Sequence, residues 1–261
     1  MPLVVFVMID GLRPETVTPD YCPTFAGVMA RGASTLRAAS ILPSITLPCH
    51  MTIFHSVPPE RHGVTSNTWS PMARPVPGLV DVAHAAGKRC AFFYNWEPLR
   101  NVSQPGSLWV SHFRDSAYNR DGDVGIAAEA ARLLSNDPPD FAFIYFGTVD
   151  TTGHAYGWMS NEYLTQAAFV DQSLRTVLEV LPGNSFILIH SDHGGHDRNH
   201  GTNSPEDMTI PWATAGPGIR RGHTLTSAVS LLDTAPTLAR LLRIAPHPEW
   251  EGRCVEEIFE A

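Results

Sequence analysis

The stretch from Ile187 to Gly201 reads ILIHSDHGGHDRNHG, an apolar run that ends abruptly in polar residues beside a pair of glycines. Such a run is typical of a buried strand, and it places Asp192 and His193 where that strand ends. Carboxylate and imidazole groups beside glycine suit a divalent-metal site, to which His200 can return from the loop. Taken alone, the stretch also fits a buried strand followed by a polar loop with solvated histidines. Further ligands therefore have to come from the rest of the chain.

Length and composition indicate one globular domain over residues 1–261. Hydrophobic residues make up 43% of the chain and charged residues 17%, which predicts a sizeable core. The formal net charge of −8 argues against a nucleic-acid polymer as partner, because such binding depends on many Lys and Arg contacts with phosphates. A small anionic substrate is compatible with this charge, since bound metal ions dominate their local field.

The N-terminal residues 1–10 are apolar but lack a basic start and a small-residue cleavage site. They predict a first strand and not a signal peptide. No apolar run approaches the roughly 20 residues that a membrane span needs, so we expect no membrane partner. The four cysteines contain no Cys-x-x-Cys pair and are expected to be reduced thiols. We therefore expect a cytoplasmic protein; the oligomeric state is not encoded in any pattern that we recognise.

Apolar runs alternate with segments of helical spacing along the chain. Strands are expected at residues 3–9, 33–38, 89–94, 141–146, 186–189 and 208–215. Helices are expected at residues 23–31, from about 46, and at 77–86, 123–134, 163–181 and 230–242. Residues 95–123 are rich in aromatic side chains and are either a small cap, a cleft-lining segment or a cover for the sheet. This order predicts an α/β fold with a mostly parallel central sheet flanked by helices on both faces.

Three of the expected strands end in acids or imidazoles. These are Asp10 after the first strand, Asp150 and His154 after the strand at 141–146, and Asp192 with His193 after the strand at 186–189. Ligands of parallel α/β sheets bind outside the carboxyl ends of the strands, so these side chains are expected to converge. The spacing of four places Asp150 and His154 on one face if their segment is helical. We therefore expect a site for two metal ions at this edge.

The residues LPSITLPCHMTIF at 42–54 predict the start of a helix, with Pro48 in its first turn and Thr46 at about its N-cap. A helix start offers unpaired backbone N–H groups and the positive end of the dipole. A phosphate or other oxyanion is therefore favoured beside the Thr46 hydroxyl. Simple capping of the helix is the alternative role of Thr46.

Together these motifs resemble the alkaline phosphatase superfamily, and most closely its type I phosphodiesterase and nucleotide pyrophosphatase branch. The resemblance spans nearly the whole chain. It rests on VMIDG at 7–11, PSITLPCH at 43–50, GVTSN at 63–67, DTTGH at 150–154, SDHGG at 191–195, and HG at 200–201 ahead of MTIP at 208–211. The order of these stretches, and their place at strand ends, makes the set more specific than any one of them.

The resemblance implies two divalent metal ions, zinc or alternatively manganese. One is implied to be held by Asp10, Asp192, His193 and Thr46, and the other by Asp150, His154 and His200. His196 lies four residues before His200 and is the competing ligand. We prefer His200 because His-Gly followed by Met-x-x-Pro matches the family pattern. We expect His196 either to contact a metal-binding residue without binding the metal itself or to face solvent.

The resemblance also implies that Thr46 is a nucleophile. The adjacent metal ion would lower the pKa of its hydroxyl, and attack on phosphorus would give a covalent phospho-threonine intermediate. The Thr46 N–H and the Asn67 amide are implied to hold non-bridging oxygens of the phosphoryl group.

The function expected from these observations is a metal-dependent hydrolase for a small phosphodiester or pyrophosphate, such as a nucleotide-like molecule. A phosphomonoesterase or phosphomutase on the same scaffold is the alternative. Those relatives usually carry a large inserted cap, whereas this chain is short enough that we expect a minimal cap. A catalytically silent binding protein is a third hypothesis. Sulfate esters fit poorly, because Thr46 cannot be converted to the formylglycine that sulfatases require.

Overall fold

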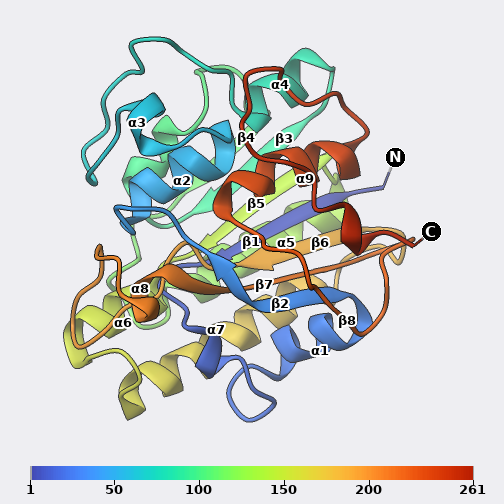
Figure 1. Ribbon diagram of the computed structural model, residues 1–261. Helices are drawn as coiled ribbons and strands as arrows, with labels where there is room; N and C mark the ends of the chain where they lie inside the picture. Colours follow the sequence, from blue (N-terminus) through green and yellow to red (C-terminus); the bar gives the residue numbers. More distant parts are fainter. Residues whose placement is uncertain (1, 261) are drawn as a thin grey trace.

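One eight-stranded sheet runs through the protein and carries helices on both faces (Figure 1). The computed structural model describes residues 2–260. The strand order in the sheet is β4-β3-β5-β1-β6-β7-β2-β8. The strands are β1 (Val4–Ile9), β2 (Ala33–Ala39), β3 (Cys90–Tyr94), β4 (Val110–Phe113), β5 (Phe141–Phe146), β6 (Phe186–His190), β7 (Thr209–Ala215) and β8 (His223–Thr224). The expected α/β fold is confirmed.

The helices form two layers. They are α1 (Pro23–Arg31), α2 (Thr46–His55), α3 (Pro59–His62), α4 (Leu79–Ala85), α5 (Gly122–Asn136), α6 (Thr148–Tyr156), α7 (Asn161–Leu178), α8 (Pro205–Met208) and α9 (Thr234–Leu242). Short 3-10 helices are η1 (Pro14–Thr16), η2 (Glu97–Asn101), η3 (Leu231–Asp233) and η4 (Glu256–Ile258). α2, α4 and α9 cover the upper face in Figure 1, and α1 and α7 lie below the sheet.

The sheet is mixed, which corrects the expectation of a mostly parallel sheet. β3, β5, β1 and β6 pair in parallel, whereas β7 pairs antiparallel with both β6 and β2. The physical reason lies in the connection from β6 to β7. A parallel return needs a crossover, usually a helix laid across the sheet. Residues 191–208 instead form a loop with only the four-residue helix α8, so the chain re-enters beside β6 in the opposite direction.

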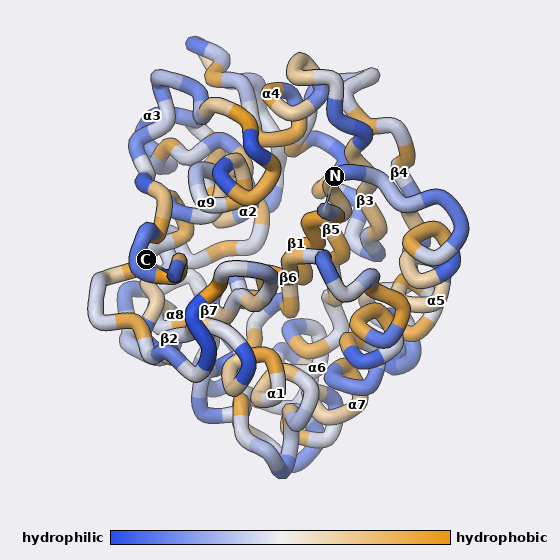
Figure 2. The backbone as a smooth tube through the Cα atoms, turned by 90° about the vertical axis from the view of Figure 1, so that its right-hand side faces the viewer, coloured by the Kyte–Doolittle hydropathy of each residue, from blue (hydrophilic) through white to orange (hydrophobic). Residues whose placement is uncertain are grey.

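The core lies on both sides of β1, whose side chains alternate between two apolar clusters. Val4, Phe6 and Met8 pack with residues of α2 and α9, whereas Val5 and Val7 pack with residues of α1, α5 and α7. Every residue of this strand is buried, as its continuous apolar run predicts. Figure 2 shows the most hydrophobic backbone stretches along β1, β5 and β6 in the middle of the protein.

Several local expectations are refined by the structure. Asp150 and His154 lie on a helix, α6, so the helical alternative for this segment is confirmed. The unassigned residues 95–123 contain η2 and the edge strand β4. The single domain over residues 1–261, which extends one residue past the described part at each end, and the minimal cap stay predictions. Among residues 2–260, no helix is long and apolar enough to cross a membrane.

Helix α1 is anchored by a carboxylate from another helix. No side chain at its own N-cap, Cys22, accepts a hydrogen bond from the first turn. Asp171 of α7 does so instead: its buried carboxylate accepts from Thr24 N at 2.8 Å and from Phe25 N at 2.9 Å. A negative charge at a helix start also interacts favourably with the dipole.

Replacing this anchor tests its contribution to stability. We expect Asp171→Ala to lower the free energy of unfolding by about 2 kcal/mol, because two charge-assisted hydrogen bonds at a helix start are lost. Urea unfolding followed by circular dichroism measures the change. The control is Gln172→Ala at the neighbouring exposed position of α7, which we expect to change stability by less than about 0.5 kcal/mol. Equal effects of both substitutions would contradict the anchoring role.

Candidate active site

Three strands that end side by side bring acids and imidazoles to one edge of the sheet. β1 lies between β5 and β6 and pairs in parallel with both. Asp10, Asp192 and His193 form one group there, and their candidate ligand atoms lie within 4.8 Å of one another. His193 Nε2 is 3.3 Å from Asp10 Oδ1 and 3.5 Å from Asp192 Oδ2. All three side chains are buried.

A second group combines α6 with the loop after β6. The candidate ligand atoms of Asp150, His154 and His200 lie within 4.8 Å of one another. Nε2 of each imidazole is 3.6 Å from an oxygen of Asp150. The rings of His193 and His200 are stacked, with centroids 3.8 Å apart, so the two groups adjoin. The structure thus brings the six residues together in the two sets expected from the sequence, while their binding of metal stays a prediction.

Each imidazole of the two groups is oriented by a backbone carbonyl. The Nδ1 contacts are His193 to Gly194 O at 2.8 Å, His200 to Ser44 O at 2.8 Å and His154 to Arg198 O at 2.9 Å. Because a carbonyl oxygen can only accept, Nδ1 carries the hydrogen in each ring. Nε2 therefore keeps a lone pair that is directed into the site, which is how metal-binding histidines are commonly fixed.

Donor atoms of both groups lack hydrogen-bond partners among residues 2–260. Asp10 Oδ1, Asp150 Oδ1 and Asp192 Oδ2 are buried and accept no hydrogen bond from this part of the chain. His154 Nε2 faces His200 Nε2 at 3.1 Å, so two lone pairs oppose each other unless a cation or a proton lies between them. Carboxylate oxygens and imidazole nitrogens in these numbers suit zinc or manganese. The residues present therefore fit two divalent cations.

Burial and mutual repulsion dominate the electrostatics of the site. Burial raises the pKa of Asp10 well above its ordinary value, and the charges of Asp192 and Asp150 raise it further. Burial also raises the pKa of Asp150. For Asp192 burial opposes ionisation, but the combined attraction by His193 and His50 and the hydrogen bonds with Asp10 and Gly11 N outweigh it, so the pKa is lowered. Burial lowers the pKa of His200 to about 3, which keeps this imidazole neutral and available as a ligand.

Thr46 is the first residue of α2 and follows the N-cap Ile45, one position later than expected. Its buried hydroxyl lies 3.3 Å from His193 Nε2, beside the first group. Leu47 N donates to Asn67 Oδ1 at 3.0 Å, which fixes the Asn67 side chain and leaves its Nδ2 as a hydrogen-bond donor. A hydroxyl, an amide and the N-terminus of a ten-residue helix therefore meet at one place.

A cavity of about 360 Å³, here called the active-site cavity, opens over this place. Thr46, Asn67 and members of both ligand groups line it. Trp96, Ala117 and Tyr118 extend its wall, so part of the segment 95–123 lies beside the cleft. No Lys or Arg is among the described residues that line the cavity. A bound oxyanion would therefore meet hydroxyl, amide and backbone donors there and no fixed side-chain cation.

His196 belongs to neither ligand group. Its Nδ1 lies 2.7 Å from Asp207 Oδ1, and this hydrogen bond raises the pKa of His196. The buried Asp207 also accepts from Thr202 N at 2.9 Å and from Thr202 Oγ1 at 2.8 Å. Asp207 thus ties together the loop that carries His200. The choice of His200 over His196 as a metal ligand stays a prediction.

Sequence reasoning missed residues that hold the candidate metal-binding side chains in place without belonging to either ligand group. The Tyr145 hydroxyl donates to Asp10 Oδ2; the only signal was one hydroxyl in an otherwise apolar strand. Gly11 has φ of +67°, and a Cβ there would lie 3.0 Å from the Cα of Asp150, so the close approach of β1 to α6 requires glycine.

The start of α6 is held by another missed residue, Asp123 of α5. Its carboxylate accepts from Gly147 N at 3.1 Å and from Thr148 N at 3.2 Å. Burial raises the pKa of Asp123 to about 6. Because Asp150 lies one turn into α6, this contact positions a candidate ligand. In the sequence Asp123 is indistinguishable from an ordinary acid in the first turn of a helix.

Comparison with known proteins agrees with this geometry. The model of the family "Type I phosphodiesterase / nucleotide pyrophosphatase" matches residues 4–208. The chain belongs to this family. The match covers β1, the helix that begins at Thr46, β5 with α6, and the loop after β6, so type I phosphodiesterase motifs coincide with the elements that build the cavity. The resemblance inferred from the sequence is confirmed.

Two curated relatives illustrate the similarity to other type I phosphodiesterases. One is an uncharacterized pyrophosphatase/phosphodiesterase of Schizosaccharomyces pombe, 26% identical over 73% of this chain and 44% of the relative. Another is ectonucleotide pyrophosphatase/phosphodiesterase family member 7 of Homo sapiens, 25% identical over 73% of this chain and 47% of the relative. The chain spans about half the length of these relatives.

A solved structure shares the fold along the entire chain. Murine ectonucleotide pyrophosphatase/phosphodiesterase 5, an inactive variant in complex with AMP, superposes with a TM-score of 0.82. The alignment covers 100% of both chains at 16% sequence identity. At this identity the similarity establishes the α/β architecture of the type I phosphodiesterases and does not extend to the ligand.

Removing one buried carboxylate tests whether the two ligand groups bind divalent cations. We expect Asp10→Asn to raise the melting temperature of metal-free protein by about 2–4 °C at neutral pH, because one of three mutually repelling carboxylates is lost. Zinc should then stabilise the variant much less than the parent protein. Differential scanning calorimetry with and without zinc measures both effects. The control Asp20→Asn removes the same charge at an exposed position; zinc stabilisation lost equally in both variants would contradict the assignment.

The affinity for zinc should depend on pH. Protons compete with the metal for Asp10 and Asp150, whose pKa values are raised above the ordinary value of 3.8. We therefore expect affinity to rise as the pH increases from about 5 to 7, since the carboxylates lose these protons. His200 does not contribute, because its pKa of about 3 keeps it neutral throughout. Isothermal titration calorimetry measures the trend, and an affinity that falls with rising pH in this range would contradict it.

Proposed function

We propose that this protein hydrolyses small phosphodiesters or pyrophosphates, with Thr46 as the nucleophile and two divalent metal ions as cofactors. One observation carries the proposal: the Thr46 hydroxyl lies at a helix N-terminus, 3.3 Å from His193 Nε2, in the cavity that both ligand groups line. The family is metal-dependent. Zinc is the proposed metal and manganese the alternative, because carboxylate and imidazole ligands suit both.

The chain's own residues bind and orient the phosphoryl group. The Thr46 N–H is the backbone donor that remains for an oxyanion at the start of α2, because Leu47 N donates to Asn67 and Pro48 has no N–H. The helix dipole favours negative charge there. The Asn67 Nδ2 is a further donor, because the opposite atom of that amide is occupied by Leu47 N. His50, one turn after Thr46, holds the turn in place through Nδ1 and Thr46 O at 2.7 Å. These contacts keep the hydroxyl and the phosphorus in a fixed relation.

The proposed reaction passes through a covalent enzyme intermediate. When bound, the metal ions lower the pKa of the nucleophile, offset charge on the leaving oxygen and activate water. Thr46 Oγ1 gives up its proton to water and attacks phosphorus, so that the Oγ1–P bond forms and the bond from phosphorus to the leaving oxygen breaks. The departing alkoxide takes up a proton from water and leaves as the alcohol. The resulting phospho-threonine is then hydrolysed by water, which regenerates the Thr46 hydroxyl. Asp10, Asp192 and His193 would hold one ion beside Thr46.

The charge of the cavity favours diesters over monoesters. A phosphodiester carries one negative charge, whereas a monoester carries close to two near neutral pH. Two divalent ions beside the three carboxylates of Asp10, Asp150 and Asp192 would leave one net positive charge, which matches a diester. The described lining adds no Lys or Arg for a second negative charge. Phosphomonoesterase or phosphomutase activity is therefore the weaker alternative, and a silent binding protein is weaker still because the hydroxyl and both donor sets are present.

The setting of the reaction is part of the same proposal. We propose a cytoplasmic location and small nucleotide-like or other phosphoric-ester substrates. The matched type I phosphodiesterases are about twice as long as this chain, so the activity of the whole relatives is carried over here only as a proposal.

Replacing the nucleophile provides the first test. We expect Thr46→Ala to lower kcat for bis-p-nitrophenyl phosphate by about 10³-fold or more, because no other group replaces the attacking oxygen. Thr46→Ser, which keeps a hydroxyl, is the matched control and should retain much of the activity. Mass spectrometry of quenched parent protein should detect phosphoryl transfer to Thr46. Parental turnover by Thr46→Ala would eliminate Thr46 as the nucleophile.

Metal removal and substrate choice provide the second test. Dialysis against a chelator should abolish hydrolysis, and zinc or manganese should restore it. The kcat/KM for bis-p-nitrophenyl phosphate should exceed that for p-nitrophenyl phosphate, because the described cavity lining adds no Lys or Arg to the metal ions for a second negative charge. Turnover that is insensitive to chelation would refute metal dependence. Faster monoester turnover would reverse the substrate assignment in favour of a phosphomonoesterase.

A further inference from the structure

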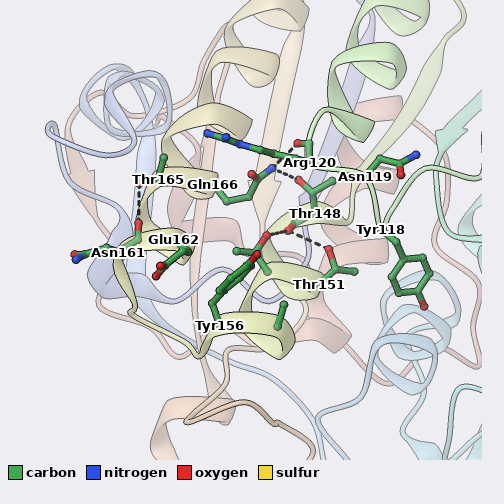
Figure 3. A pocket seen from close by; sticks show the side chains of 12 residues that line it. Tyr118, Asn119, Arg120, Thr148, Thr151, Tyr156, Asn161, Glu162, Thr165 and Gln166 are labelled. Atoms are coloured by element: carbon green, nitrogen blue, oxygen red, sulfur yellow. Dashed lines mark hydrogen bonds between the residues drawn. The ribbon is translucent and has the colours of Figure 1, made fainter.

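A second cavity of about 570 Å³ lies between α6, α7 and the loop at residues 118–120 (Figure 3). We call it the α6–α7 cavity. It is larger than the active-site cavity, and its lining comes from three segments that are distant in sequence. Drug-sized or sugar-sized molecules occupy protein cavities of about 300–1,000 Å³, so the space suffices for one such group.

The α6–α7 cavity adjoins the active-site cavity. Tyr118, Thr151 and Ala155 line both. Asp150 and His154 of the second ligand group lie on the same helix as Thr151 and Ala155. A substrate that spans the shared wall would therefore place its phosphoryl group at Thr46 and its alcohol portion between α6 and α7.

Hydroxyl groups on the two helices present acceptors to the α6–α7 cavity. Thr151 Oγ1 donates to Ala117 O at 2.8 Å, and Thr152 Oγ1 donates to Thr148 O at 2.7 Å. On α7 the Thr165 hydroxyl likewise donates to a carbonyl of its own helix at 2.7 Å. Each hydroxyl hydrogen is thus used internally, and the oxygen lone pairs remain for hydrogens that a ligand donates.

One charged residue of each sign also lines the cavity. Arg120 and Glu162 both border it (Figure 3), and within residues 2–260 neither side chain makes a hydrogen bond or an ion pair. A guanidinium group only donates hydrogen bonds and a carboxylate only accepts them. A hydroxyl group of a ligand can do both, so a molecule with several hydroxyl groups can use these two residues together.

Two exposed aromatic rings complete the surroundings. Tyr118 is 78% exposed and Tyr156 is 57% exposed, and both line the cavity. Exposed tyrosine rings offer flat apolar faces, and a bound molecule that packs against these faces removes them from water. The C–H face of a pyranose ring matches such a surface, while its hydroxyl edges match the polar groups. A straight alkyl chain would leave the polar groups unpaired, and each unpaired polar group would cost binding free energy.

We propose that the α6–α7 cavity binds a sugar, and that the substrate is a phosphodiester in which this sugar is one of the two esterified alcohols. The inference rests on the proposed function for the position of the phosphoryl group. The sugar contacts do not depend on hydrolysis. The sugar is the esterified alcohol on the α6 side of the phosphorus, and the cavity binds it without forming or breaking a covalent bond.

Direct binding tests the cavity without catalysis. Saturation-transfer NMR on the metal-loaded protein should show saturable binding of glucose and none of 1,6-hexanediol. Glu162→Gln should weaken glucose binding by about fivefold or more, because a charged acceptor is replaced by a neutral one. Thr165→Trp should abolish it by filling the space from an exposed position of α7. The control Glu179→Gln removes an exposed carboxylate near the other end of α7 and should leave binding unchanged.

Kinetics test whether the sugar belongs to the substrate. The parent protein should hydrolyse glucose 6-(methyl phosphate) with a kcat/KM at least about tenfold above that for hexyl methyl phosphate. The difference should arise from a lower KM for the sugar substrate, with similar kcat for both. Glu162→Gln should reduce this ratio by about fivefold, and Glu179→Gln should not. A ratio near one in the parent protein, or equal ratios in both variants, would overturn the proposal.

The outcomes separate this inference from the proposed function. Hydrolysis of bis-p-nitrophenyl phosphate without glucose binding would refute the sugar site and leave the hydrolase intact. Glucose binding that Thr165→Trp abolishes, in a protein that hydrolyses no diester, would refute the hydrolase and support the cavity as a sugar site. Adenosine binding at much lower concentration than glucose would overturn the choice of a sugar in favour of a nucleoside.

Discussion

Three carboxylates, those of Asp10, Asp150 and Asp192, are buried near one another at the edge of the sheet, and their mutual repulsion constrains the structure around them. Burial and the neighbouring charges raise the pKa of Asp10, so the arrangement opposes full ionisation in the protein alone. Such a cluster persists only where the surrounding fold holds it. Cations placed among these oxygens and the adjacent imidazole nitrogens would convert repulsion into attraction, and they would occupy donor atoms that have no hydrogen-bond partner among residues 2–260.

The scaffold fixes this cluster through ordinary packing and backbone contacts. β1 is buried on both faces between β5 and β6. The carboxylate of Asp10, which follows this strand, therefore cannot move without disturbing both apolar clusters. Backbone carbonyls orient His154, His193 and His200, and Asp123 and Asp207 hold the segments that carry the second group. The nucleophile candidate is positioned differently, by the start of a helix. Rigid elements thus supply the precision that metal-dependent chemistry requires.

Much of the candidate site could be predicted because its signals are local. An apolar run followed by Asp or His marks a strand end, and strand ends of parallel neighbours meet at one edge. From the sequence alone, this reasoning places Asp10, Asp150 and Asp192 together. Thr46 was found from the proline and the helix start that follow it. Tyr145, Asp123 and the partner of His196 were missed, since each acts through a contact with a residue remote in sequence, which no local pattern records.

The sequence by itself determined the longer helices and strands, the α/β class and the family, because periodicity, turn residues and short motifs are written along the chain. It left the short strands β4 and β8 and the short helices α3 and α8 unassigned. It did not determine the direction of β7, the α6–α7 cavity or the hydrogen-bond partners of the individual histidines. Strand direction depends on how a connection packs against the sheet, and a cavity depends on three segments that meet only after folding. His196 and His200 illustrate the limit. They lie four residues apart in one loop and are chemically identical, but His196 contacts Asp207 within this connection whereas His200 faces Asp150 of α6.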